Sequence, residues 1–170
     1  MHDIFLSRPS ALGPESEFAY EQFMRFLKKE QFTPRRLGKS DYSLKAPLHA
    51  VIDIMDQCEG AIILGYAQVV IQHEIKRGTT VQASSGMVLP TPWNQIEGSL
   101  AYFRKIPVMV IAQEGVSGGI FDYGVTGDFI LTLDLCAPKW HLDERFTQIY
   151  SQWKTRMTNR ESNLVVDPTH

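Results

Sequence analysis

The stretch Leu89-Pro90-Thr91-Pro92-Trp93-Asn94-Gln95-Ile96-Glu97 predicts the start of a helix. Thr91 can cap the free amides of the first turn, and Pro92 suits the first helical position, where no N–H is needed. Glu97 follows Trp93 by four residues and therefore lies on the same side of the helix. This makes Glu97 a candidate catalytic carboxylate beside an aromatic ring. The alternative is a solvated glutamate favoured by the helix dipole. Apolar side chains recur along the helix at helical spacing, at Trp93, Ile96, Leu100 and Phe103.

Apolar runs and amphipathic segments alternate on both sides of this stretch. Short runs typical of buried strands lie at 4–6, 32–37, 61–64, 108–111 and 129–133, and the segments between them have helical spacing. Such alternation is typical of an α/β domain with a parallel sheet. We therefore predict one flavodoxin-like domain over residues 1–157, with about five parallel strands in the order 2-1-3-4-5 and helices on both faces. Residues 158–170 form a polar tail that we expect to fray.

Composition excludes several classes of function. The chain has 170 residues, 44% of them hydrophobic and 21% charged, which is ordinary for a soluble protein. A net charge of −2 without a basic run disfavours nucleic acid as a partner, and no apolar run approaches the roughly 20 residues that span a bilayer. Cys58 and Cys136 are typical of free thiols, and the start of the chain lacks signal-peptide features, so we expect a cytoplasmic protein.

The motifs of the common nucleotide-binding and hydrolase folds are missing from the sequence. There is no GxxxxGK[ST] loop, no GxGxxG after the first strand and no GxSxG elbow. The five histidines are scattered without metal-ligand spacing. We therefore expect neither a metal nor a bound cofactor.

Several polar and aromatic side chains follow predicted strands, at the sheet edge where open α/β folds bind ligands. Ser7 and Arg8 follow the first strand, and the arginine fork suits a phosphate or a carboxylate, although a surface arginine in a turn fits equally well. Tyr66 and Tyr123 are candidates to stack on a ring of a bound ligand. Trp93 and Asn94 are candidate substrate contacts, with core packing as the alternative for Trp93.

Residues 67–88 form the least regular part of the chain. The segment is too long for a tight connection between a strand and a helix. A short helix or hairpin followed by a loop would fit it. A lid or specificity loop is one interpretation of such an excursion, and an insertion without a role is the other.

Two families of enzymes share short motifs with this chain. Glu97, Ala101 and Pro107-Val108 resemble the "E-x-x-x-A … K-P-V" stretch of nucleoside 2-deoxyribosyltransferases, in which the glutamate is the nucleophile. Trp93-Asn94-Gln95-Ile96-Glu97 resembles the "W-x-x-x-E" segment of TIR domains, in which the glutamate is catalytic in NAD-cleaving members. Asp3-Ile4-Phe5-Leu6-Ser7 resembles the first TIR strand, "D-V-F-I-S", and 58–64 resembles the strand before the catalytic loop in both families. Residues 89–92 carry no aspartate where the transferases have "D-x-G-T".

The resemblance implies an N-glycosidase that cleaves the base–ribose bond of a nucleotide, with NAD as the leading substrate rather than a cofactor. Glu97 would be the catalytic carboxylate, because cleavage passes through an oxocarbenium-like state that a carboxylate can stabilise or trap. A deoxyribosyltransferase or a nucleoside-monophosphate N-glycosidase is the alternative enzyme. A non-catalytic nucleotide sensor or a self-assembling signalling module is the alternative outside enzymes. The TIR resemblance further implies a homo-oligomer and a role in bacterial antiphage defence.

Overall fold

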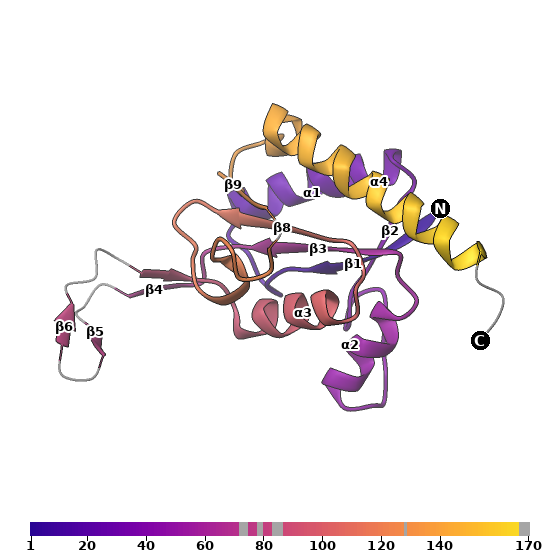
Figure 1. Cartoon of the computed structure of the whole chain (residues 1–170). Coiled ribbons are helices and arrows are strands. Elements are labelled where there is room, and N and C mark those ends of the chain that lie inside the picture. The colour runs from indigo at the N-terminus through magenta and orange to yellow at the C-terminus, as the bar shows by residue number, and fades with distance from the viewer. Residues whose placement is uncertain (72–74, 78–79, 83–86, 128, 167–170) are drawn as a thin grey trace.

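The computed structural model describes residues 1–71, 75–77, 80–82, 87–127 and 129–166. Its centre is a sheet of five parallel strands in the order β2-β1-β3-β8-β9 (Figure 1). These strands are β1 (His2–Ser7), β2 (Phe32–Arg35), β3 (Gly60–Gly65), β8 (Val108–Gln113) and β9 (Ile130–Leu133). If these five strands are numbered one to five along the chain, their order in the sheet is 2-1-3-4-5. The predicted flavodoxin-like fold is therefore confirmed.

Two helices cover each face of the sheet. Helices α1 (Pro14–Lys29) and α4 (Glu144–Val166) lie on one face, and α2 (Pro47–Met55) and α3 (Pro92–Phe103) lie on the other (Figure 1). Short 3-10 turns, η1 (Gly119–Phe121) and η2 (Trp140–Leu142), precede β9 and α4. Helix α4 continues beyond the predicted limit at residue 157 to Val166, and residues 167–170 lie outside the described part.

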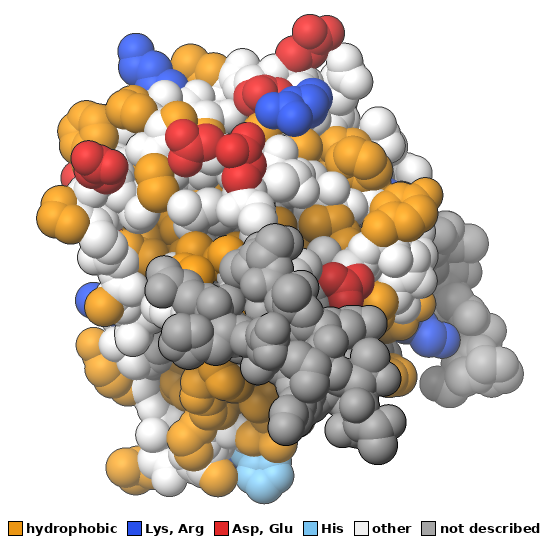
Figure 2. All heavy atoms as spheres, turned by 90° about the vertical axis from the view of Figure 1, so that its left-hand side faces the viewer, with side chains coloured by type: hydrophobic (Ala, Val, Ile, Leu, Met, Phe, Trp, Pro, Cys, Tyr) orange, Lys and Arg blue, Asp and Glu red, His pale blue; other side chains and the backbone are white. Residues whose placement is uncertain are grey.

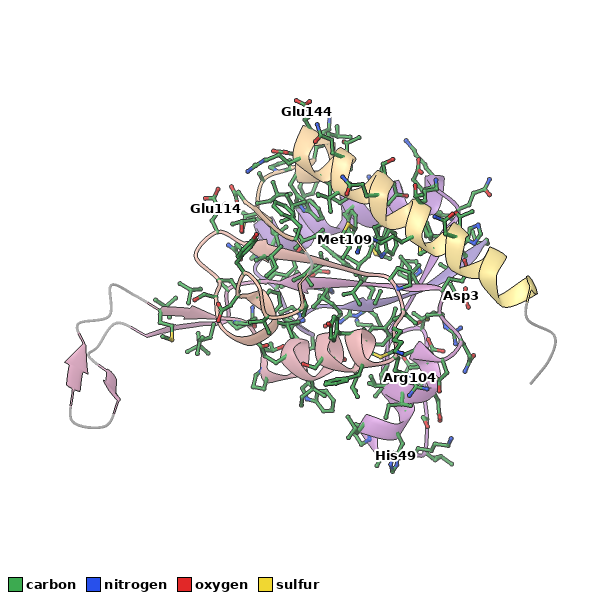
Figure 3. All side chains as sticks on the ribbon, viewed as in Figure 1. Asp3, His49, Arg104, Met109, Glu114 and Glu144 are labelled. Atoms are coloured by element: carbon green, nitrogen blue, oxygen red, sulfur yellow. The ribbon has the colours of Figure 1, made fainter. Side chains whose placement is uncertain are left out.

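The core consists of two hydrophobic clusters, one on each face of the sheet. Successive strand residues point to opposite faces, so Leu6 and Ile62 pack under α1 and α4, whereas Phe5 and Ile63 pack under α2 and α3. All six residues of β3 are buried, which explains why its apolar run shows no alternation in sequence. Figure 3 shows the first cluster filling the space between sheet and helices, with Met109 inside it.

The irregular segment after β3 forms antiparallel ribbons that extend from the carboxyl edge of the sheet (Figure 1). β4 (Val69–Ile71) pairs with β7 (Met87–Leu89), and β5 (Ile75–Arg77) pairs with β6 (Thr80–Gln82). The base is tied to the loop after β8, because the Ser117 amide donates to the Val88 carbonyl at 3.1 Å. Of the two expected forms of this segment, a short helix or a hairpin, the structure shows antiparallel pairing, as in a hairpin, at the base. Residues 72–74, 78–79 and 83–86 lie outside the described residues.

Helix α3 rests on the sheet through small side chains and leaves larger ones at the surface. Its buried residues are Asn94, Gly98 and Ala101. A methyl group at Gly98 would meet the Ile120 side chain at 2.1 Å, so glycine permits close packing there. Much of the predicted apolar stripe faces solvent, with Trp93 44% and Phe103 80% exposed. Within the described residues, no helix is both long and apolar enough to cross a membrane.

Candidate active site

The amino-terminal turn of α3 has the capped geometry that its sequence predicts. The Thr91 hydroxyl accepts a hydrogen bond from the Asn94 amide at 3.1 Å, and Pro92 occupies the first turn. Helix α3 packs against β1 and β3, so its first two turns lie beside the residues that follow β1. Glu97, one turn further along, is thereby held near the carboxyl edge of the sheet. In Figure 3, Glu114, directly after β8, marks this edge, and Asp3, near the start of β1, marks the opposite one.

A cavity of about 230 Å³ opens beside Glu97. It lies between the end of β1, the connection from β2 to α2, and the first turns of α2 and α3. Its walls are apolar on the sheet side, and its polar groups are two arginines, two hydroxyls and one carboxylate. The described lining residues are Phe5, Leu6, Arg8, Pro9, Ser10, Arg36, Leu37, Pro47, Val51, Thr91, Trp93 and Glu97.

Glu97 carries the negative charge of this cavity. Burial raises the pKa of its carboxyl above the ordinary glutamate value, while a hydrogen bond from Ser7 and the positive charge of Arg36 act in the opposite direction. Perturbed carboxyl groups of this kind, placed in a cavity, are frequent at catalytic sites. The group can act as a nucleophile or charge stabiliser when ionised and as a proton donor when neutral.

Ser7 and Asn94 form the wall behind Glu97. The Asn94 side-chain amide donates to Ser7 Oγ at 2.7 Å, and Thr91 Oγ1 donates to Asn94 Oδ1 at 2.8 Å. Both Ser7 and Asn94 are almost completely buried. Asn94, predicted as a substrate contact, is therefore packed behind the described lining of the cavity.

Arg8 lines the cavity, but its guanidinium is held by a partner within the chain. Two of its nitrogens donate to the Glu17 carboxylate at 2.9 and 3.0 Å, and the group lies 4.1 Å from the centre of the Tyr20 ring. Burial of the side chain makes this pairing a fixed feature of the wall. A phosphate contact by Arg8 would have to share the guanidinium with Glu17.

Arg36 is a second cavity cation, and sequence reasoning did not select it. The residue directly follows β2, and its guanidinium donates to the Arg8 carbonyl at 3.4 Å. Arg36 could have been selected from the sequence because it lies at the carboxyl end of a predicted strand, next to Arg35. Arg35 differs in role, because it bonds Asp41 and Asp3 and thereby anchors the loop after β2.

The two predicted stacking tyrosines lie away from this cavity. Tyr66 is 1% exposed and belongs to the core cluster under α1 and α4, on the opposite face of the sheet. Its hydroxyl has no hydrogen-bond partner among the described residues, and burial raises its pKa. Tyr123 is exposed on the loop after η1. Of the predicted residues, the structure brings Glu97, Arg8 and Trp93 to the cavity, and Ser7 and Asn94 directly behind it.

The described residues contain no group of three histidine, cysteine, aspartate or glutamate side chains that could hold a metal ion. The chemistry available to the cavity from these residues is therefore that of a carboxylate, hydroxyls and guanidinium groups.

Comparison with known proteins gives a structural likeness. No protein-family model and no curated protein sequence matches this chain. The fold is similar to the solved structure of the CMP N-glycosidase BcmB from Clostridium botulinum, with a TM-score of 0.51 and 14% sequence identity. The match covers 87% of this chain and 98% of that chain. The likeness establishes a fold shared with an N-glycosidase and does not separate the TIR and deoxyribosyltransferase resemblances.

Proposed function

We propose that this protein is an N-glycosidase that hydrolyses the bond between base and ribose in a nucleotide, with Glu97 as the catalytic carboxylate. The observation that carries the proposal is the position of Glu97, half-buried in a cavity at the carboxyl edge of the sheet, with two arginines in its walls. The fold shared with a CMP N-glycosidase supports the same class of reaction.

The reaction needs a negatively charged group of the protein beside the anomeric carbon and a route for the leaving base. As the C1′–N bond breaks, its electron pair goes to the base, which takes up a proton, and positive charge develops at C1′. The ionised Glu97 carboxylate stabilises that charge or bonds to C1′, and water then delivers hydroxide to C1′ and releases the sugar. Such a role requires Glu97 to be ionised at the working pH, as the Ser7 hydrogen bond and Arg36 favour.

The cavity favours a nucleoside monophosphate as the substrate. Arg36 places a cation at the β2 side of the cavity, and guanidinium is well matched to phosphate oxygens. Arg8 also lines the cavity, but its guanidinium is paired with Glu17. NAD is the second candidate, favoured by the "W-x-x-x-E" motif at Trp93 and Glu97.

The proposal is tested by measuring the release of free base by chromatography. The protein is incubated with CMP, with the other nucleoside monophosphates, with the parent nucleosides and with NAD. We expect base release from at least one nucleotide, and a loss of about 100- to 10,000-fold in Glu97→Gln. Glu114→Gln is the matched control, because Glu114 is an exposed carboxylate at the same sheet edge and should retain the wild-type rate.

Full activity in Glu97→Gln would contradict the role of this residue. No release from any substrate at high protein concentration would contradict the enzyme proposal and favour a nucleotide-binding or assembly module. In that case calorimetry with CMP and NAD measures whether the cavity binds a nucleotide at all.

A further inference from the structure

Three arginines lie in or beside the cavity wall, and two of them are matched by carboxylates. Arg8 is paired with Glu17, and Arg35 is paired with Asp41. Arg36 forms no ion pair with any carboxylate of the described residues. Its guanidinium donates to the Arg8 carbonyl at 3.4 Å, which uses one of its five N–H donors. Of the two cations that line the cavity, Arg36 is therefore the one whose charge is left for an anion.

A tight turn after β2 holds the backbone of Arg36. The Arg36 carbonyl accepts hydrogen bonds from the backbone amides of Ser40 and Asp41 at 3.2 and 3.1 Å. The Gly38 amide donates to the Asp41 carbonyl at 2.7 Å, and Gly38 has a φ of +73°, which glycine adopts without strain. Residues 36–41 therefore close on themselves at the point where the chain enters the cavity wall.

A row of side-chain hydrogen bonds fixes this turn to the sheet. Ser40 Oγ accepts from the Arg36 backbone amide at 2.8 Å and donates to the Asp41 carboxylate at 2.7 Å. Asp41 also accepts from Arg35 Nε at 2.9 Å, and Arg35 donates to Asp3 on β1 at 2.7 Å. The Arg35 guanidinium holds the pKa of the Asp41 carboxyl below its ordinary value, so this carboxylate is charged at neutral pH.

We propose that Asp41 is a positioning residue that, through Ser40, fixes Arg36 as the group that binds the phosphate of the substrate. The phosphate in this statement rests on the proposed function. Asp41 is separate from the described lining of the cavity, so it acts through the turn and not on the substrate. Because the backbone of Arg36 is already held, less conformational freedom is lost when an anion binds. The turn should therefore set the preference for a nucleotide over its nucleoside.

The charge of Asp41 gives this proposal a distinctive sign. A carboxylate near the cavity repels a bound phosphate, so its removal should by charge alone strengthen anion binding. If Asp41 holds Arg36 in place, its removal should weaken anion binding instead. Positioning and simple charge therefore predict opposite changes for Asp41→Asn, which keeps the size of the side chain.

The experiment measures binding by calorimetry in the Glu97→Gln background, in which the proposed reaction is blocked. CMP is compared with cytidine and AMP with adenosine, and the ratio of the two dissociation constants reports on the phosphate. We expect each nucleotide to bind more tightly than its nucleoside. Asp41→Asn should reduce this preference about 10-fold, as expected for one hydrogen bond at a charged group, and should leave nucleoside binding unchanged. Ser40→Ala should act in the same direction even if Asp41→Asn does not fold.

Two further variants separate positioning from general damage. Arg36→Met should abolish the preference, and adding Asp41→Asn to it should cause no further loss, because Asp41 acts through Arg36. Asp53→Asn is the matched control. It removes a carboxylate from a different ion pair, with Lys45 before α2, and changes the net charge by the same amount. It should leave the preference for the nucleotide unchanged.

Binding is measured without turnover, so the two proposals fail separately. An unchanged or increased preference in Asp41→Asn and Ser40→Ala would overturn the positioning role. An equal loss in Asp53→Asn, or a further loss in the double variant, would overturn it as well. It also falls if neither nucleotide binds better than its nucleoside, whereas base release by the wild type would then still support the proposed function. If binding behaves as expected but the wild type releases no base, the positioning role stands and the proposed function falls.

Discussion

At the scale of single residues, the charged form of Glu97 that the proposed reaction needs is the form that burial disfavours. Burial raises the pKa of its carboxyl in the folded protein above the unfolded value near 4.5. The folded state therefore keeps its proton to higher pH than the unfolded state does. By linkage, the stability associated with this group is fully present below the unfolded pKa and is lost as pH rises through the folded pKa. At neutral pH the ionised Glu97 thus lowers the free energy of unfolding.

We expect Glu97→Gln to be more stable than the wild type at pH 7. Glutamine resembles the protonated acid, keeps an oxygen that can accept from Ser7, and carries no charge that burial would penalise. Thermal unfolding measured between pH 4 and 8 should show a higher melting temperature for the variant at neutral pH. The gap should close as pH falls below the ordinary glutamate pKa. A variant that is less stable than the wild type at pH 7 would contradict this account, and the exposed Glu114→Gln should show no such pH-dependent gain.

Glu97 could be selected from sequence, whereas the contact between Asn94 and Ser7 near it could not. The cap at Thr91, the proline after it and the spacing from Trp93 to Glu97 are local features, and local features are readable in a sequence. The contact between Asn94 and Ser7 joins residues 87 positions apart. It depends on how the end of β1 meets the first turn of α3, which is a property of the assembled sheet.

At the scale of elements, strand alternation explains why Tyr66 lies away from the cavity. Successive residues of a strand point to opposite faces, and the side of β3 that faces α2 and α3 carries Ala61 and Ile63. Leu64 and Tyr66 belong to the cluster under α1 and α4. Applied to β3 and the residue that follows it, this alternation would have separated Tyr66 from Phe5, which lines the cavity.

The described side chains of the ribbon between β3 and α3 lie outside the core. No described side chain between residues 68 and 87 belongs to either hydrophobic cluster. Backbone hydrogen bonds hold the base of the ribbon, from Gln68 to Leu89 and from Ser117 to Val88.

We expect the domain to fold without residues 72–86. Ile71 and Met87 are paired in the antiparallel register, so an Asn-Gly pair inserted between them would close a two-residue hairpin. The shortened protein should keep the far-UV circular dichroism of the parent fold and a single thermal transition close to that of the wild type. Loss of cooperative unfolding would contradict this expectation. With the nucleotide panel, kcat/KM of the same variant measures whether the ribbon acts as the predicted specificity loop.

At the scale of the whole molecule, charge is unevenly distributed. Seen onto the carboxyl edge, hydrophobic side chains are visible over the whole face, whereas most of the visible acidic side chains lie in the upper half, away from α2 and α3 (Figure 2). The exposed apolar residues of those two helices include Leu48, Trp93, Ile96 and Phe103. Glu97, directed to the cavity, is the one charged residue within α3. Helix α2 packs against α3, and exposed apolar side chains on neighbouring helices are typical of a protein–protein contact.

We expect this face to join two copies of the chain in a homodimer. A two-fold contact places the same patch against itself, and an α3 surface without exposed charge can meet its own copy without repulsion. Light scattering coupled to size exclusion should give about twice the monomer mass of 19.3 kDa. Phe103→Glu should shift the protein to the monomer, because it would bury two carboxylates at the contact. Leu142→Glu is the matched control, since Leu142 is 63% exposed on η2, an element that packs against α1 and α4. A wild-type protein that stays monomeric up to high concentration would contradict the dimer, and so would a Phe103→Glu variant of unchanged mass.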